Sequence, residues 1–104
     1  MDRNLMLRAL ADENRMKIVE MLLRHNMCVR SIANKLGITQ AAVSQHVRVL
    51  REAGLVSGEK RGYFMHYEVN RMALKSLADH LADLAQVKKS GEHSCKCHEN
   101  KEEI

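Results

Sequence analysis

The chain of 104 residues contains no proline, and none of its apolar runs approaches the roughly 20 residues that span a bilayer. Without proline, the ends of its helices and strands have to be read from Gly, Asn, Asp and Thr. It also lacks a charged and then apolar leader that ends in small residues, so we expect a cytoplasmic protein. Its three cysteines fit that compartment, because two of them are separated by a single residue, too close for a structural disulfide framework.

Acidic side chains are scarce in most of the chain. Residues 1–89 hold 15 Lys and Arg against 9 Asp and Glu, whereas residues 90–104 hold 2 against 4. A basic body of this size indicates a polyanionic partner, most simply nucleic acid. We therefore expect one domain over residues 1–89, followed by a flexible tail over residues 90–104 that is rich in Cys and His.

Two adjoining segments carry the spacing of amphipathic helices. Residues 4–25 predict two helices, with Asp12 as the N-cap of the second. Residues 28–56 predict two more, in which Gly37 ends one helix, Thr39 caps the next and Gly54 ends it. The buried faces of this second pair are expected to be Val29, Ile32, Ala33 and Leu36, then Val43, Val47 and Leu50. Two short helices joined by a tight glycine turn form a helix-turn-helix.

After Gly54 the spacing of the apolar residues changes from that of a helix to the two-residue alternation of a strand. Residues 63–69 alternate in the manner of a strand, and residues 55–60 are the expected antiparallel partner, with the turn at Arg61–Gly62. Asn70 then caps a long final helix. Its apolar stripe comprises Leu74, Leu77, Ala78, Leu81, Leu84 and Ala85. The predicted fold is mainly α with a β-hairpin wing: a winged helix-turn-helix of order α-α-α-α-β-β-α.

In a helix-turn-helix the second helix enters the major groove and presents its outer face to base edges. Gln pairs with adenine, Ser bonds several base edges and a small Ala admits a thymine methyl. The candidate base-reading residues are Gln40, Ala41, Ser44, Gln45 and Arg48. Thr39 and the first N–H groups of the helix can hold a phosphate, and Lys60 and Arg61 on the hairpin suit phosphate or minor-groove contact.

For any single polar residue on that helix, the alternative interpretation is that it belongs to a solvated helix face and does not contact DNA. His46 falls between the outer and inner faces, where a half-buried hydrogen-bonding role is favoured over base readout. The glycine turn, the basic hairpin and the basic body together favour DNA binding.

A cluster of metal-ligating residue types lies in the tail "GEHSCKCHEN". Cys95 and Cys97 can chelate one thiophilic ion, and His93 or His98 can add a nitrogen. Cys28 either joins them in a three-thiolate site or is simply packed. The spacing is tighter than in structural zinc modules, which favours an exchangeable site. A disordered acidic tail with incidental ligands is the alternative.

Three stretches together resemble the ArsR/SmtB family of bacterial metal-sensing repressors: "LADENRMKIVEMLL", "IANKLGITQAAVSQHVRVLREAGLV" and "GEKRGYFMHYEV". The resemblance covers roughly residues 5–88. It implies a homodimer built from the first and last helices, which binds an inverted repeat in its operator and leaves when an inducer binds. The apolar stripes of those two helices fit a dimer, although an intramolecular core alone is the other interpretation.

The chain departs from the family's recurring sensor sites. Arsenic-sensing members look like Cys-x-Cys at the start of the helix before the recognition helix, and here Cys28 is followed by Arg30 in place of the second cysteine. Zinc-type members use acids and histidines of the last helix. The matching positions are occupied by Arg71, Ala73, Leu84 and Val87, and Asp79, His80 and Asp83 resemble a solvated face.

From these features we expect a non-enzymatic, DNA-binding repressor that acts as a homodimer. Its inducer is expected to be As(III), Cd, Zn or Cu(I), bound through the terminal cysteines. A repressor of the same fold that responds to thiol oxidation or persulfide is the alternative. A metal-buffering protein with a vestigial DNA-binding domain remains a further possibility. A thiol-redox enzyme is disfavoured, because "CKC" lies outside any fold able to shape a substrate pocket.

Overall fold

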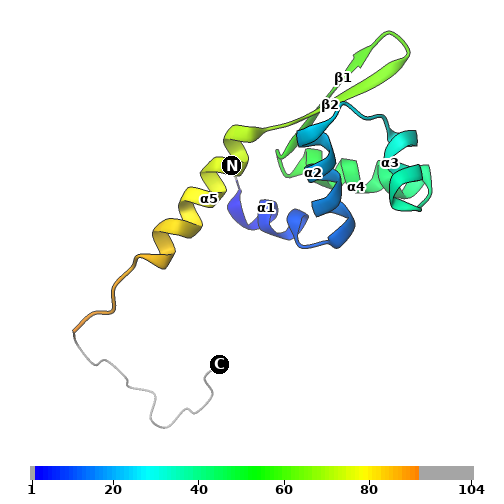
Figure 1. Ribbon diagram of the computed structural model, residues 1–104. Coiled ribbons are helices and arrows are strands. Elements are labelled where there is room, and N and C mark those ends of the chain that lie inside the picture. The colour runs from blue at the N-terminus through cyan, green and yellow to red at the C-terminus, as the bar shows by residue number, and fades with distance from the viewer. Residues whose placement is uncertain (1, 92–104) are drawn as a thin grey trace.

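The computed structural model describes residues 2–91, in which four helices, a hairpin and a fifth helix follow one another (Figure 1). The elements are α1 (Arg3–Leu10), α2 (Glu13–Arg24), α3 (Val29–Leu36), α4 (Gln40–Glu52), β1 (Val56–Arg61), β2 (Phe64–Val69) and α5 (Arg71–Ala85). This order confirms the predicted winged helix-turn-helix. The predicted tail ligands His93, Cys95, Cys97 and His98 lie outside the described residues.

Short-range signals fix the helix boundaries as predicted. The side chains of Asp12, Thr39 and Asn70 each accept a hydrogen bond from the backbone N–H three residues ahead, at 3.1, 3.0 and 3.1 Å. These bonds satisfy donors that have no partner inside a helix. Gly37 and Gly54 have φ of 70° and 79°, a left-handed conformation that ends α3 and α4 and that other residues rarely adopt.

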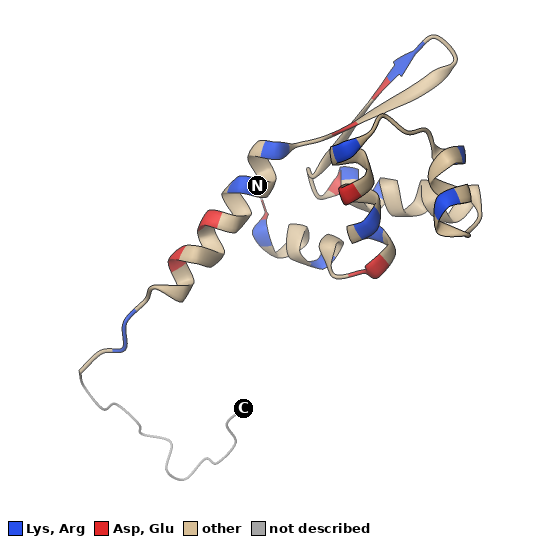
Figure 2. Ribbon diagram, viewed as in Figure 1, with Lys and Arg blue, Asp and Glu red and all other residues tan. Residues whose placement is uncertain are grey.

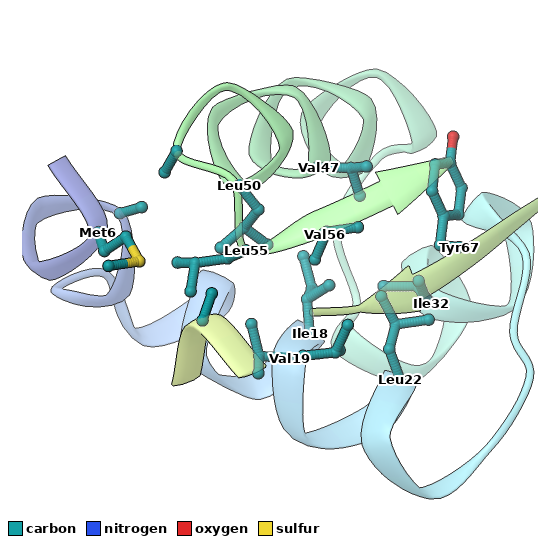
Figure 3. Close-up of a cluster of buried hydrophobic side chains, with 14 of the residues drawn as sticks. Met6, Ile18, Val19, Leu22, Ile32, Val47, Leu50, Leu55, Val56 and Tyr67 are labelled. Carbon is teal, nitrogen blue, oxygen red and sulfur yellow. The ribbon is translucent and has the colours of Figure 1, made fainter. Parts of the chain in front are cut away.

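The core lies where α2, α3 and α4 meet the base of the hairpin (Figure 3). Ile18, Ile32 and Leu50 are fully buried there, one from each helix, and Leu55 joins them from the segment before β1. The predicted inner face of α4 is confirmed, because Val43 and Val47 are 0% and 2% exposed like Leu50. Burying this stripe fixes the opposite face of α4 toward solvent.

The hairpin differs from its predicted form by one residue at the turn. In the antiparallel register Arg61 pairs with Phe64, so the turn residues are Gly62 and Tyr63, and not Arg61–Gly62. Gly62 has a φ of 62°, which a two-residue hairpin turn of this kind requires at its first central position. The alternating side chains of β2 are buried only near the base of the hairpin, where Tyr67 and Val69 are covered. The outer half of the strand is exposed.

Helix α5 extends away from the rest of the chain (Figure 1). Ala73 and Leu77 in its first half are buried against the core, whereas Leu81 and Leu84 farther along are 45% and 55% exposed. An intramolecular core therefore accounts for only the beginning of the predicted stripe. Over residues 2–91, none of the helices has the length and apolar character needed to cross a membrane.

Candidate nucleic-acid interface

The outer face of α4 is open to solvent along its length. The predicted base-reading side chains are all exposed: Gln40, Ala41, Ser44, Gln45 and Arg48. Thr39 is exposed as well, and its hydroxyl already caps the helix by accepting from the N–H of Ala42. The face is thus presented by a helix whose other side is locked into the core, as major-groove reading requires.

A groove runs between this face of α4 and the base of the hairpin, and sequence reasoning missed part of its lining. It is lined by Ser44, Gln45, Val47, Arg48, Arg51, Glu52, Val56, Ser57, Gly58 and Tyr67. Arg51 follows Arg48 by three residues, a spacing that puts both guanidinium groups on one helix face. This spacing is the signal in the sequence from which Arg51 could have been predicted as a groove residue. Ser57 and Tyr67 come from the strands, and no local signal in the sequence joins them to α4.

Gly58 allows the ring of Tyr67 to lie across the neighbouring strand at the edge of this groove. A Cβ atom at residue 58 would stand 3.0 Å from Cε1 of Tyr67 and 3.1 Å from the terminal methyl of Met65. Contacts of this length are tighter than most, so a larger residue at this position would displace the Tyr67 ring and the Met65 methyl by a few tenths of an ångström.

One acidic side chain enters the groove. Oε2 of Glu52 lies 3.2 Å from Nε of Arg48, one helical turn away, and both side chains are largely exposed. Arg48 is therefore engaged within its own helix when no ligand is present. An exposed pair of this kind is weak, so a stronger anion can replace the carboxylate.

The wing carries its two predicted cations close to the tip (Figure 2). Lys60 and Arg61 are both exposed and are successive residues of β1, so their side chains leave opposite faces of the hairpin. Nη2 of Arg61 lies 3.2 Å from Oε1 of Glu59 on the same face.

His46 occupies the half-buried position predicted for it. Its Nδ1 atom lies 3.4 Å from Nη1 of Arg15 and 4.0 Å from Oδ2 of Asp12, both at the beginning of α2. The hydrogen bond that Asp12 accepts from the Arg15 N–H is the main cause that lowers the pKa of this carboxyl, and His46 contributes less. The predicted hydrogen-bonding role of His46 is confirmed, and its side chain joins α4 to α2.

Cys28 is the N-cap residue of α3 and is half-buried. Its N–H donates to Oγ of Ser31 at 3.1 Å, and its Sγ lies 3.5 Å from the same oxygen. The side-chain hydrogen bond from Ser31 is the main cause that lowers the pKa of the thiol. Among residues 2–91, no group of three or more His, Cys, Asp and Glu side chains could hold a metal ion.

Asp79 and Asp83 of α5 are exposed, as predicted for a solvated face, whereas His80 is half-buried. Asp79 accepts from Nζ of Lys75 at 3.3 Å, an exposed pair one helical turn apart. His80 and Asp83 line the same shallow pocket beside Arg3 of α1.

An exposed helix-turn-helix face, an adjoining groove lined by Arg48 and Arg51, and a projecting wing together define the class: a winged helix-turn-helix transcriptional regulator. The family model described as "Bacterial regulatory protein, arsR family" matches residues 12–57. Among its relatives, the transcriptional activator HlyU of Vibrio cholerae is 32% identical over 74 residues, which cover 71% of this chain and 68% of HlyU. The chain belongs to the ArsR family.

Two further relatives match over a similar share of the chain. The transcriptional repressor SmtB of Mycobacterium tuberculosis is 40% identical over 75 residues, which cover 72% of this chain and 50% of SmtB. The cadmium resistance regulatory protein CadC of Lactococcus lactis is 34% identical over 71 residues, covering 67% and 60% of the two chains. The chain thus spans only half to three fifths of these two relatives.

The solved structures agree on the fold. An ArsR-like transcriptional regulator from Rhodococcus sp. RHA1 superimposes with a TM-score of 0.72 at 28% identity, covering 80% of this chain and 78% of that one. The homodimeric winged helix-turn-helix domain of Mb0332 from Mycobacterium bovis gives a TM-score of 0.63 at 24% identity, covering 86% of each chain. At that identity the second likeness speaks for the fold alone.

Proposed function

We propose that this protein is a cytoplasmic transcriptional repressor that binds its operator as a homodimer and is released by a thiophilic metal or metalloid ion. The observation that carries DNA binding is the outer face of α4, where Gln40, Ser44, Gln45 and Arg48 are all exposed beside a groove. Thr39 and Lys60 would contact phosphates on either side of the bases that this face reads. The names of relatives include both an activator and a repressor, and we favour repression on the likeness to SmtB.

The exposed apolar side chains of α1 and α5 support the dimer. Leu81 and Leu84 lie on the half of α5 that leaves the body, and Leu5 and Leu7 of α1 are 37% and 38% exposed. Covering such surface with the same surface of a second copy removes it from water and gives a two-fold axis. Two α4 helices related by that axis would read an inverted repeat with half-sites about one helical turn apart. The homodimeric state named for Mb0332 is consistent with this arrangement.

The proposed inducer site is the Cys-x-Cys pair, for which the support is the chemistry of the donors. Cys95 and Cys97 offer two thiolates, His93 and His98 offer imidazole nitrogens, and together they suit As(III), Cd²⁺, Zn²⁺ or Cu⁺. Cys28 would add a third thiolate, and its lowered pKa favours the form that binds metal. The name of the relative CadC links one such protein to cadmium resistance.

Release of DNA would follow from a shift between two dimer geometries. If the tail closes on the body only when its thiols are occupied, occupation favours the geometry that it contacts, and the spacing of the α4 pair changes with it. The coupling needed is about 1–3 kcal/mol, the usual range for allosteric effects.

A repressor that responds to thiol oxidation or persulfide is the second candidate, favoured by the same adjacent thiols and by the lowered pKa of Cys28. The two candidates share the fold and the operator. They differ in whether release needs a metal ion or an oxidant.

The deciding experiment adds each ion, and separately an oxidant or a persulfide donor, to the complex between the dimer and duplex DNA from directly upstream of its gene. Fluorescence anisotropy reports release. We expect a thiophilic ion to release the DNA and the double variant Cys95→Ser/Cys97→Ser to stay bound. Cys28→Ser, measured beside it, reports whether the third thiolate takes part in the response. Release only by the oxidant or the persulfide donor supports the second candidate, and retention of DNA under every addition overturns both.

A further inference from the structure

An open cavity of about 410 Å³ lies between the beginning of α3 and the outer half of the hairpin. Its lining includes Met27, Cys28 and Ser31 on the helical side and Arg61, Phe64 and His66 on the hairpin side. Sites for small molecules have volumes of about 300–1,000 Å³ and combine apolar walls with a few polar groups. The size of this cavity therefore suits a compact organic molecule with one ring.

Two large apolar side chains form walls of this cavity, one from each side. Phe64, the first residue of β2, is 67% exposed, and Met27, in the connection between α2 and α3, is half-buried and packs against the core. An aromatic ring that the fold leaves so open offers a flat apolar face to a ligand. A ligand with a conjugated ring could cover this face by offset stacking, which an aliphatic ligand does less well.

Cys28 supplies a nucleophile inside the same cavity. It is half-buried at the N-cap of α3, and its Sγ lies 3.5 Å from Oγ of Ser31. The side-chain hydrogen bond from Ser31 is the main cause that lowers the pKa of the thiol, and the backbone N–H groups of Ser31 and Arg30 act in the same direction. Reactive cysteines are partly exposed thiols with a lowered pKa near a cation, and here Arg61 lines the cavity beside the thiol.

The polar groups around the thiol disfavour a metal ion as the occupant of this cavity. Nε2 of His66 lies 2.8 Å from Oε2 of Glu68, so this nitrogen is already engaged. The guanidinium group of Arg61 carries a positive charge at the cavity and would repel a cation. Throughout residues 2–91, no three side chains of His, Cys, Asp and Glu form a set that could hold a metal ion. A thiolate between apolar walls therefore suits a soft carbon electrophile.

We propose that this cavity is a covalent site for α,β-unsaturated carbonyl compounds that carry an aromatic ring, with Cys28 as the nucleophile and Phe64 as the wall that covers the ring. Sγ of the thiolate attacks the β-carbon and forms a C–S bond, while the π electrons of the C=C bond move toward the α-carbon. Water then protonates the α-carbon, so the product is a thioether and no oxidant or reductant takes part. The adduct would contact both the first helix of the helix-turn-helix and the wing.

The test compares the labelling rates of Cys28 by two probes with the same reactive carbon, N-phenylmaleimide and N-methylmaleimide. The full chain carries Cys95→Ser/Cys97→Ser so that only Cys28 reacts, and intact-mass spectrometry follows the adduct. N-acetylcysteine gives the ratio of the two rates for a free thiol. We expect the ratio of the phenyl rate to the methyl rate to be about five-fold larger in the protein, because the ring gains a contact with Phe64.

Variants of the two neighbouring aromatic residues locate this gain. Phe64→Ala is expected to remove most of it, and Phe64→Tyr keeps a ring and is expected to retain it. The matched control is Tyr63→Ala, which removes the adjacent exposed ring outside the cavity lining and is expected to leave the ratio unchanged. Circular dichroism verifies that each variant keeps its fold.

Three results would overturn the inference. A ratio equal to that of N-acetylcysteine would show that Cys28 is an accessible thiol without a ligand site. Equal slowing of both probes by Phe64→Ala would mean that the substitution alters the thiol and not a contact with the ring. The same loss in Tyr63→Ala would place the effect outside the cavity. All rates are measured on the free protein, so their outcome is independent of whether the proposed DNA-binding function holds.

Discussion

The guanidinium group of Arg15, in the first turn of α2, lies 3.4 Å from Nδ1 of His46 in the middle of α4. The same group donates from Nε to the carbonyl oxygen of Ala9 at 2.7 Å, near the end of α1. One side chain therefore joins α1, which we assign to the dimer interface, to the helix that we assign to DNA reading. It also satisfies a carbonyl at a helix end that has no partner within the helix.

Replacing Arg15 with Met is expected to lower the free energy of unfolding by about 1–2 kcal/mol, because a charge-assisted hydrogen bond to Ala9 is lost while the apolar stem is kept. The urea midpoint measures this loss. The matched control is Arg24→Met, an exposed arginine at the other end of the same helix, which is expected to change the midpoint little. Equal midpoints for the two variants would mean that the contact contributes nothing to stability.

Element order and helix boundaries could be predicted because their causes lie within a few residues. Thr39 caps α4 through an N–H three positions away, and Gly37 ends α3 through its own φ. The contact between Arg15 and His46 joins residues 31 positions apart, and no periodicity reports such a pairing. Half-burial of His46 was predictable from its place on the helix, whereas its partner was not.

The hairpin and the groove show the same limit. Alternation identified the strands but misplaced the turn by one residue, because an alternating pattern sets the side-chain faces and leaves the exact turn open. It also could not tell that only the base of the hairpin is covered. Tyr67 and Ser57 reach the groove beside α4 through the packing of the hairpin, which depends on the whole fold.

Asn70 holds the junction between the hairpin and α5 with both atoms of its amide. Oδ1 accepts from the N–H of Ala73 at 3.1 Å, and Nδ2 donates to the carbonyl oxygen of Gly54 at 3.2 Å. Asn70→Ala is expected to lower the free energy of unfolding by about 1–2 kcal/mol, because a cap and a second hydrogen bond are lost. Asn70→Asp keeps the cap and loses only the second hydrogen bond, so its melting temperature should lie between those of the wild type and of Asn70→Ala. If the aspartate variant is no more stable than the alanine variant, the N-cap hydrogen bond does not contribute to stability.

A substitution at Leu84 tests whether the apolar stripe of α5 forms the dimer interface. Leu84→Glu places a charge where we expect the face of a second copy, and the cost of burying that charge is expected to give monomers in sedimentation equilibrium. Ala82→Glu adds the same charge at a nearby exposed position outside the stripe and is expected to remain dimeric. DNA affinity should fall with the first variant only. A dimer that tolerates Leu84→Glu would place the interface elsewhere.

Ser31 tests the acidity of the thiol at the start of α3. Its side-chain hydrogen bond lowers the pKa of Cys28, so the thiolate fraction near neutral pH is larger than for a free cysteine. Ser31→Ala should raise that pKa, slow alkylation by iodoacetamide near neutral pH and move the pH profile of the rate to higher pH. The measurement uses a Cys95→Ser/Cys97→Ser background so that only Cys28 reacts. Overlapping pH profiles would show that Ser31 does not control the thiol.

Glu52 gives a prediction of stronger binding. Its carboxylate lies 3.2 Å from Nε of Arg48 and is the acidic group that lines the groove beside α4. Glu52→Gln removes a charge that repels phosphate and releases Arg48, so affinity for the upstream duplex should rise several-fold and its dependence on salt should steepen. The matched control is Glu13→Gln, which breaks the pair with Lys17 at the same 3.2 Å on α2, away from that groove. If both variants raise affinity equally, the gain comes from net charge alone, and the placement of the DNA against Arg48 is wrong.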